Sequence, residues 1–291
     1  MRNTTLLKKM ILERKALVVS GAYDVLSAIL IEKTGFKALQ VSGFGIAGSM
    51  LGKPDVGLLT FTEMLMVTKN IVRSVSIPVM ADGDTGFGNV INLIRTVEEF
   101  ESIGCAGINI EDQTFPKKCG HMEGKSLISM DEMVLKIEAA VDSRKDPDFV
   151  INARTDAASI YGIDEAIERG NAYAKAGADL IFLEAISGRH DIGRAVKEID
   201  APVSINLFDA IGGGKTELVS IEELKYLGVA RVSIPVGTIF AAAKGIKAYL
   251  EALFEKGILP DKKELAMSFD EWKTLLGIEK VYRLERKYLR K

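Results

Sequence analysis

Residues 175–185 read KAGADLIFLEA, and the fold can be predicted from the pattern in this stretch. A helical segment ends at Gly177, a run of apolar residues follows, and the carboxylate of Glu184 stands where that run ends. Glycine suits the end of a helix because it adopts the left-handed conformation without steric cost. The apolar run shows little alternation with polar residues, which indicates a strand buried on both faces, as in a parallel sheet covered by helices.

The same order of helix, glycine, apolar strand and polar residue recurs along the chain. Glycines expected to end helices also stand at Gly35, Gly104 and Gly228, and capping-box spacings expected to begin helices occur at Thr60–Glu63, Ser129–Glu132 and Ser220–Glu223. The segments that read as strands are KALVVSG (15–21), ALQV (38–41), IPVMA (77–81), AGINI (106–110), FVINA (149–153), DLIFL (179–183), VSINL (203–207) and RVSIP (231–235). With helices between most of them, these strands predict an α/β fold of the (β/α)8 TIM-barrel type; an open, doubly wound sheet is the alternative.

The chain is predicted to form a single barrel domain over residues 1–291. The strand pattern ends near residue 250, so the barrel occupies about residues 1–250 and C-terminal helices occupy about 251–291. No strand remains for those helices to cover. We therefore expect the C-terminal extension to pack on another subunit.

Composition excludes several classes of protein. Lys and Arg number 38 against 40 Asp and Glu, so the net charge of −2 argues against binding to nucleic acid or to a membrane surface through bulk charge. Two cysteines are too few for a disulfide framework and suggest a reducing compartment. The first residues, MRNTTLLKKMILERK, lack the apolar core of a signal peptide, and no apolar run reaches the roughly 18 residues of a membrane span. These features predict a cytoplasmic protein.

Polar residues follow nearly every predicted strand. In TIM barrels the active site lies at the C-terminal ends of the strands, so these side chains are expected to meet there. They are Tyr23, Asp24, Ser42, Gly43, Asp82, Gly83, Asp84, Glu111, Asp112, Arg154, Thr155, Asp156, Glu184, Asn206 and Ser233. So many acids exceed what solvation of the strand ends requires.

Two of these acids indicate a metal site. Asp82 and Asp84 lie two residues apart in ADGDTGFGN (81–89), directly after a strand, and carboxylates so spaced can face one hard cation. Glu111 and Asp55 are further acids at comparable positions, which favours Mg²⁺ over the alternative that the two aspartates only form Asx turns. The glycines of this segment do not form a phosphate-binding loop, because no Lys-Ser/Thr pair follows them.

A loop at residues 111–125, EDQTFPKKCGHMEGK, combines a thiol with cations. Lys117, Lys118 and His121 are expected to lower the pKa of Cys119 and so prepare it to act as a base, acid or nucleophile. Gly120 and Gly124 allow the loop to bend over a ligand as a lid. The alternatives are a buried inert cysteine, which the charged neighbours disfavour, and a solvated basic loop with an incidental thiol. In contrast, Cys105 is expected in the core and His190 on the surface.

These segments together resemble the isocitrate lyase/phosphoenolpyruvate mutase superfamily. The similar segments, in order, are VSGFGIAGSMLGKPDVGLLT (41–60), ADGDTGFG (81–88), INIEDQTFPKKCGH (108–121), DPDFVINARTDA (146–157) and GADLIFLEA (177–185). The resemblance covers nearly the whole chain. It implies a barrel whose last helix is swapped between subunits, usually in a homotetramer, a requirement for Mg²⁺ with Mn²⁺ as an alternative, and substrates that are 2-oxo or 2-hydroxy acids.

The resemblance also implies roles for individual residues. Asp82 would bind the metal directly, and Asp84, Glu111 and Asp55 would hold it through water. Substrate would be held by Ser42, Gly43 and Phe44 at the pyruvyl carboxylate and oxygen, by Arg154 at the α-oxygen, by Glu184 and Asn206 at its remaining groups, and by Gly120 and His121 at the departing carboxylate. Cys119 would give or take the proton, with Lys117 and His121 as its catalytic neighbours.

Retro-aldol cleavage of a 2-hydroxy diacid to pyruvate and a second carboxylate suits these residue types, because the departing carbanion needs fixed donors and a nearby acid. The residues do not identify the base that takes the hydroxyl proton. KKCGH replaces the Lys-Thr-Asn-Ser of phosphoenolpyruvate mutases, and Gln40 stands where methylisocitrate lyases place Tyr. After Asn206 comes LFDAIGGGKT instead of their Thr-Glu-Phe-Gly. A substrate of the 2,3-dimethylmalate type is therefore at least as well supported as 2-methylisocitrate. The alternatives are a carboxyvinyl-carboxyphosphonate phosphorylmutase, an oxaloacetate hydrolase, and a barrel that binds a 2-oxo acid without turnover.

Overall fold

The computed structural model describes residues 1–208, 212, 214–258 and 263–289. Its parallel strands close into a barrel in which each strand pairs with the next and β8 pairs with β1. The strands are β1 (Leu17–Ala22), β2 (Leu39–Val41), β3 (Val79–Asp82), β4 (Gly107–Glu111), β5 (Val150–Thr155), β6 (Leu180–Leu183), β7 (Val203–Asn206) and β8 (Arg231–Ile234). The predicted (β/α)8 barrel is therefore confirmed, and the open-sheet alternative is wrong.

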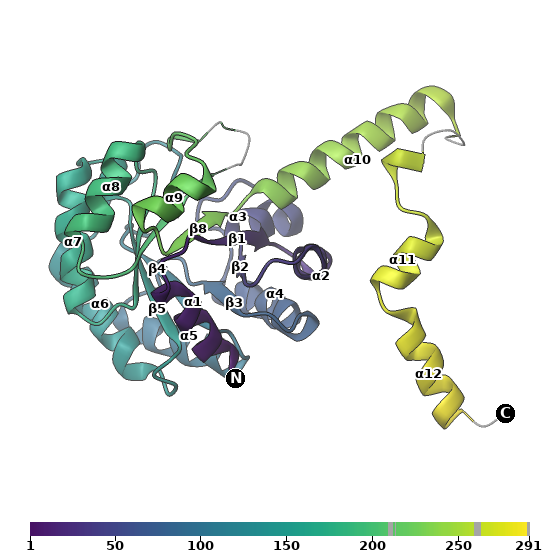
Figure 1. Cartoon of the computed structure of the whole chain (residues 1–291), viewed down its shortest axis with the longest axis horizontal. Coiled ribbons are helices and arrows are strands. Elements are labelled where there is room, and N and C mark those ends of the chain that lie inside the picture. Colours follow the sequence, from purple (N-terminus) through teal and green to yellow (C-terminus); the bar gives the residue numbers. More distant parts are fainter. Residues whose placement is uncertain (209–211, 213, 259–262, 290–291) are drawn as a thin grey trace. The chain divides into compact units, whose positions relative to one another are not determined.

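Helices separate the strands and surround the barrel (Figure 1). They are α2 (Val25–Thr34), α3 (Gly43–Ile46), α4 (Phe61–Ser74), α5 (Val90–Ser102), α6 (Met130–Ser143), α7 (Ile163–Lys175), α8 (Arg189–Glu198) and α9 (Ile221–Leu227), with a π-helical turn at Ala47–Leu51 and a 3₁₀ turn at Ala157–Ser159. The four glycines expected to end helices all have positive φ, between 85° and 107°. Thr60 and Glu63 form the predicted reciprocal capping box. At Ser129 and Ser220 only the serine hydroxyl accepts a backbone N–H, so the reciprocal half of the predicted box is absent there.

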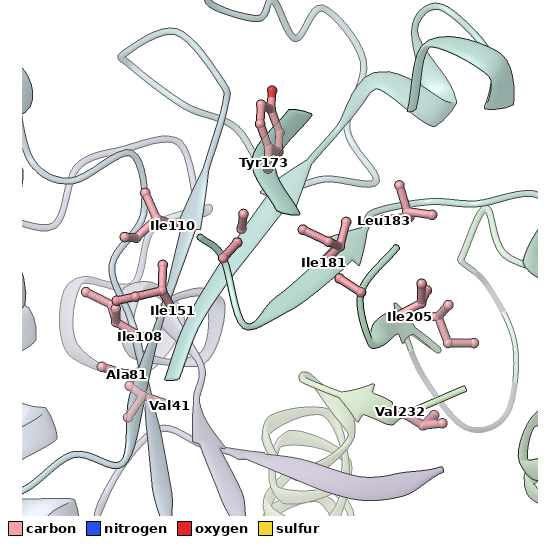
Figure 2. Close-up of a cluster of buried hydrophobic side chains, with 14 of the residues drawn as sticks. Val41, Ala81, Ile108, Ile110, Ile151, Tyr173, Ile181, Leu183, Ile205 and Val232 are labelled. Atoms are coloured by element: carbon pink, nitrogen blue, oxygen red, sulfur yellow. The ribbon is translucent and has the colours of Figure 1, made fainter. Parts of the chain in front are cut away.

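The main core lies between the outer faces of the strands and the helices. Figure 2 shows Ile108, Ile110, Ile151 and Ile181 among the apolar side chains that fill this space. A smaller cluster closes the other end of the barrel. Helix α1 (Asn3–Leu12) places Leu7 and Ile11 in one cluster with residues at or near the N-terminal ends of the strands. Both faces of the strands are buried, as predicted, but the barrel interior is polar toward the C-terminal strand ends, where the site is built.

The chain divides into two compact units, Met1–Thr238 and Ile239–Lys291. The second unit contains most of α10 (Gly237–Lys256), a 3₁₀ turn (Lys263–Leu265), α11 (Phe269–Leu275) and α12 (Ile278–Tyr288). None of the described residues in these three helices is buried, and many of their apolar side chains are exposed. No helix that the structure describes is both long enough and apolar enough to cross a membrane.

Candidate active site

A cavity of about 60 Å³ opens at the C-terminal ends of the strands. Thirteen of the predicted substrate, metal and catalytic residues line it: Ser42, Gly43, Phe44, Asp55, Asp82, Glu111, Lys117, Cys119, Gly120, His121, Arg154, Glu184 and Asn206. The remaining one, Asp84, contacts the cavity-lining Lys117 at 2.8 Å. The structure thus brings the predicted set together in one place, while leaving the role of each residue a prediction.

Asp82 ends β3 and is held by backbone donors. Its Oδ2 accepts the N–H of Gly43 at 2.9 Å, and its Oδ1 accepts the N–H of Asp84 at 3.2 Å. A Cβ on Gly43 would lie 2.8 Å from Asp82 Oδ2, so glycine is needed for this approach. The segment predicted to bind the pyruvyl group is therefore joined to the predicted metal ligand by a direct hydrogen bond.

Lys117 neutralises the acids around Asp82. Its ammonium lies 2.6 Å from Asp55 Oδ1 and 2.8 Å from Asp84 Oδ1, and all three side chains are buried. Burial alone would lower the pKa of Lys117, but Asp84 and Asp55 hold that pKa well above its usual value. Burial raises the pKa of Asp84 to about 7 against the opposing effect of Lys117. The lysine therefore acts as a fixed cation at this side of the cavity.

The donor set fits a hard divalent cation. Within the part of the chain that the structure describes, no three His, Cys, Asp or Glu side chains converge closely enough to hold a metal by themselves. The predicted arrangement does not require such convergence, because Mg²⁺ keeps several waters and takes one or two protein carboxylates. Glu111 Oε1 is buried and has no hydrogen-bond partner in the described part of the chain, so it can accept a hydrogen bond from a metal-bound water.

Arg154 lines the cavity and lies among three acids. Its guanidinium lies 3.2 Å from both Glu111 Oε2 and Glu184 Oε2, and its Nε lies 2.9 Å from Asp156 Oδ2. Asn206 Nδ2 also donates to both Glu184 oxygens, at 3.0 and 3.2 Å. Burial would raise the pKa of Glu184, but these partners together with His121 lower it to about 2. Glu184 is therefore an anion at neutral pH.

His121 reaches the same carboxylate from the loop. Its Nε2 lies 3.1 Å from Glu184 Oε1, and its Nδ1 accepts the backbone N–H of Lys215 at 2.9 Å. Because Nδ1 is an acceptor, the neutral ring carries its proton on Nε2, facing Glu184. Lys215 belongs to the segment after β7, of which residues 209–211 and 213 lie outside the described residues.

The prediction that neighbouring cations lower the pKa of Cys119 is wrong. The thiol is 9% exposed, and burial raises its pKa to about 11, with Glu184 and Asp55 adding to the rise. Lys117 does not lower it because Asp55 and Asp84 take up its charge, and Lys118 Nζ reaches away to the carbonyl of Glu123. The charged neighbours in the sequence disfavoured a buried cysteine, but the Cys119 side chain is buried. A protonated thiol at neutral pH suits a proton donor.

Gly120 follows the thiol of Cys119 where the loop backbone lies against the barrel. A Cβ at this position would lie 2.3 Å from Glu184 Cγ and 2.6 Å from Arg154 Nη2. Lys125 fixes the far end of the loop, where its ammonium donates to the Gly120 carbonyl and to Asp156 Oδ1, the latter at 2.8 Å. Glycine thus lets the loop backbone approach the Arg154–Glu184 pair.

Three further residues were not predicted as site residues. Lys125 ends the loop that the sequence singled out, yet its contact with Asp156 depends on how the loop folds back. Asn109, in the middle of β4, and Arg231, at the start of β8, also line the cavity. Arg231 could have been found, because it is a charge within the apolar run RVSIP. The other expectations hold: Cys105 is 1% exposed in the core, and the side chain of His190 is 85% exposed.

Comparison with known proteins shows the family to which the chain is similar. The family model described as phosphoenolpyruvate phosphomutase matches residues 7–254. The 2,3-dimethylmalate lyase of Eubacterium barkeri is 42% identical over 288 residues, which are 99% of each chain. The 2-methylisocitrate lyase of Aeropyrum pernix is 41% identical over 93% of this chain and 86% of its own. A structure of phosphonopyruvate hydrolase in complex with oxalate and Mg²⁺ superimposes with a TM-score of 0.90 at 29% identity, over 100% of both chains.

Proposed function

The chain belongs to the phosphoenolpyruvate phosphomutase family, and from this premise we propose that it is a carbon–carbon lyase that cleaves a 2-hydroxy diacid to pyruvate and a second carboxylate. A diacid of the 2,3-dimethylmalate or 2-methylisocitrate type is the substrate class. The observation that carries the proposal is that a protonated thiol, Cys119, lines the same cavity as the Gly43–Asp82 pair. Both relatives are lyases by name, and they match over most of the chain.

The reaction requires one part of the cavity to hold the pyruvyl group and another to protonate the departing carbanion. The substrate hydroxyl loses its proton, the C2–C3 bond breaks, and C2 becomes the carbonyl carbon of pyruvate. The electron pair stays on C3 as an aci-carboxylate, which then needs a proton. Cys119 supplies it, because its raised pKa keeps the thiol protonated at neutral pH. Ser42, Gly43 and Phe44 hold the pyruvyl side, where the backbone is fixed by Asp82.

Fixed donors stabilise the departing fragment. The loop brings Gly120 and His121 to its carboxylate, and Arg154, which three carboxylates hold in place, lies beside them at the α-oxygen of the substrate. Donors fixed in a buried site are worth more than the same donors in water, and they need no reorganisation during the reaction. The loop also excludes water from the carbanion.

We propose Mg²⁺ as the cofactor, with Asp82 as its direct ligand and Asp84, Glu111 and Asp55 as residues that hold it through water. When bound, the metal supplies a Lewis acid for the oxygens of the 2-oxo acid. The all-oxygen donor set, the unpartnered Glu111 Oε1 and the Mg²⁺ in the phosphonopyruvate hydrolase structure support this assignment. Because Cys119 must remain a thiol, a reducing cytoplasm is the compartment that we propose.

The activity is tested by following Mg²⁺-dependent release of a 2-oxo acid from 2,3-dimethylmalate, 2-methylisocitrate, isocitrate and oxaloacetate. A lactate dehydrogenase coupled assay reports pyruvate, and oxalate is measured directly. We expect pyruvate from one diacid, and its loss with EDTA and in Cys119→Ala. Oxalate from oxaloacetate alone would support a hydrolase instead, and full activity of Cys119→Ala would contradict the proton-donor role. Cys105→Ala is the matched control, because that thiol lies in the core away from the cavity.

We further propose that the C-terminal helices are exchanged between subunits of a homotetramer. Helix α10 carries exposed Ile246, Leu250 and Phe254, and Phe254 is 94% exposed. Apolar side chains exposed in such number favour burial against a partner. Light scattering should show a tetramer that dissociates in Phe254→Asp. Tyr226→Asp, at an 85% exposed position of α9, should leave it intact. A monomeric wild-type protein would contradict the proposal.

A further inference from the structure

Arg231 is a buried cation on the wall of the cavity. It is the first residue of β8, is 1% exposed, and lines the cavity beside Gln40 and Phe182. Its guanidinium donates to Ser204 Oγ at 3.1 Å and to Gln40 Oε1, and both acceptors are neutral. Its Nε has no hydrogen-bond partner among the residues that the structure describes. The side chain is therefore fixed in place without being neutralised.

This distinguishes Arg231 from the other cations that line the cavity. Among the residues that the structure describes, Lys117 and Arg154 each lie within 3.2 Å of at least one carboxylate, whereas Arg231 forms no ion pair. Within the same part of the chain, Lys136 is also buried without an ion pair, but it donates to the carbonyl of Thr85 and does not line the cavity. A buried charge without a partner is costly, and proteins rarely retain one. The cost is offset if an anion binds in the cavity beside it.

The comparison with Arg154 shows which cation remains available to a ligand. The two guanidinium carbons lie 5.5 Å (Arg154) and 5.9 Å (Arg231) from the ring centroid of Phe182, so both groups border the same aromatic side chain. Glu111, Asp156 and Glu184 already take up the charge of Arg154. Among the described residues, only the more distant Asp82 acts on the charge of Arg231.

We propose that Arg231 is a substrate-recognition residue whose unneutralised charge selects doubly charged acids over singly charged ones. This inference rests on the proposed function, which supplies the diacid substrate, and it assigns part of the selection to a residue in the barrel interior. Gln40 and Ser204 act as positioning residues that hold the guanidinium at the cavity wall.

The test compares Arg231→Met and Arg231→Lys by calorimetry with oxalate and pyruvate as probes, both in the presence of Mg²⁺. At an effective dielectric constant near 20, a unit charge about 10 Å away changes the affinity for a singly charged ligand roughly tenfold, and for a doubly charged one roughly 100-fold. We therefore expect Arg231→Met to lose about tenfold in pyruvate affinity and about 100-fold in oxalate affinity. Arg231→Lys, which keeps the charge, should retain most of both.

Folding of the variants is checked by thermal unfolding, and Arg231→Gln replaces Arg231→Met if the latter does not fold. On the diacid identified by the activity panel, the neutral variant should raise KM more than it lowers kcat. Equal losses for oxalate and pyruvate, or equal behaviour of the Lys and Met variants, would overturn the inference and leave Arg231 a structural residue. If the wild-type protein binds neither acid, the proposed function fails and takes this inference with it.

Discussion

The protonation state of Cys119 gives the sharpest test of the reasoning about the site. Burial raises the pKa of this thiol from 9.0 to about 11, so its thiolate fraction at neutral pH should be about 100-fold smaller than that of an unperturbed thiol with pKa 9.0. The lysine-rich loop sequence predicts the opposite, a lowered pKa and a larger thiolate fraction. The two expectations differ in direction, which makes the measurement decisive.

The assay is alkylation of Cys119 by iodoacetamide, followed by mass spectrometry in a Cys105→Ala background so that a single thiol reacts. Limited access slows the reaction at every pH, so the informative quantity is the pH dependence and not the rate itself. The rate should rise about tenfold per pH unit from pH 7 to pH 10 without levelling off, because the thiolate is the nucleophile. A plateau below pH 9 would show that the neighbouring cations outweigh burial, and the proton-donor argument would then fail.

Three further predictions concern the loop, the carboxylate pair and the barrel base. Gly120→Ala should reduce cleavage strongly and cost about 1–3 kcal/mol of stability, because its Cβ would lie 2.3 Å from Glu184 Cγ; Gly48→Ala, with open space around it, is the control for activity and urea unfolding. The folded pKa of Glu184, about 2, lies below its usual 4.5, so its contribution of about 3 kcal/mol is present above pH 4.5 and is lost as the pH falls toward 2. The stability difference between wild type and Glu184→Gln should accordingly shrink between pH 7 and pH 3, and a constant difference would contradict this. Leu7→Ala should lower the free energy of unfolding by about 2–5 kcal/mol, whereas Leu12→Ala, at a 61% exposed position of the same helix, should change it little; equal urea midpoints would refute the role of α1.

The barrel was predictable because its determinants are local. A glycine after a helix and an apolar run after the glycine identify each strand without knowledge of its neighbours, and Gly177 and the strand after it are an example. The order of the strands then follows from the preference for neighbouring parallel pairing. The helix starts at Ser129 and Ser220 were also predicted correctly, but the full capping box was not: both serines cap their helices, and Glu132 and Glu223 do not return the hydrogen bond.

The composition of the site was predictable, but its electrostatics were not. Strand-end position and family resemblance identified Asp82, Arg154 and Glu184, which the fold brings around one cavity. The pKa of Cys119 depends on burial and on which acids occupy the nearby lysine, and neither quantity is visible in the order of residues along a loop. Charge near a thiol in sequence therefore does not establish charge near it in space.

The spatial partners of the loop's charged residues also explain how the loop is held against the barrel. Lys117 contacts Asp55 and Asp84, His121 approaches Glu184, and Lys125 reaches Asp156, so these three basic side chains of the loop all end on acids of the barrel unit. Several of these acids are also the ones predicted to hold the metal and the substrate. By linkage, any ligand that changes the charge available on them must change the free energy of loop docking, and docking must change the ligand's affinity by the same factor. The cations of this loop, which the sequence assigned to tuning the thiol, thus couple the position of Cys119 to the occupancy of the site.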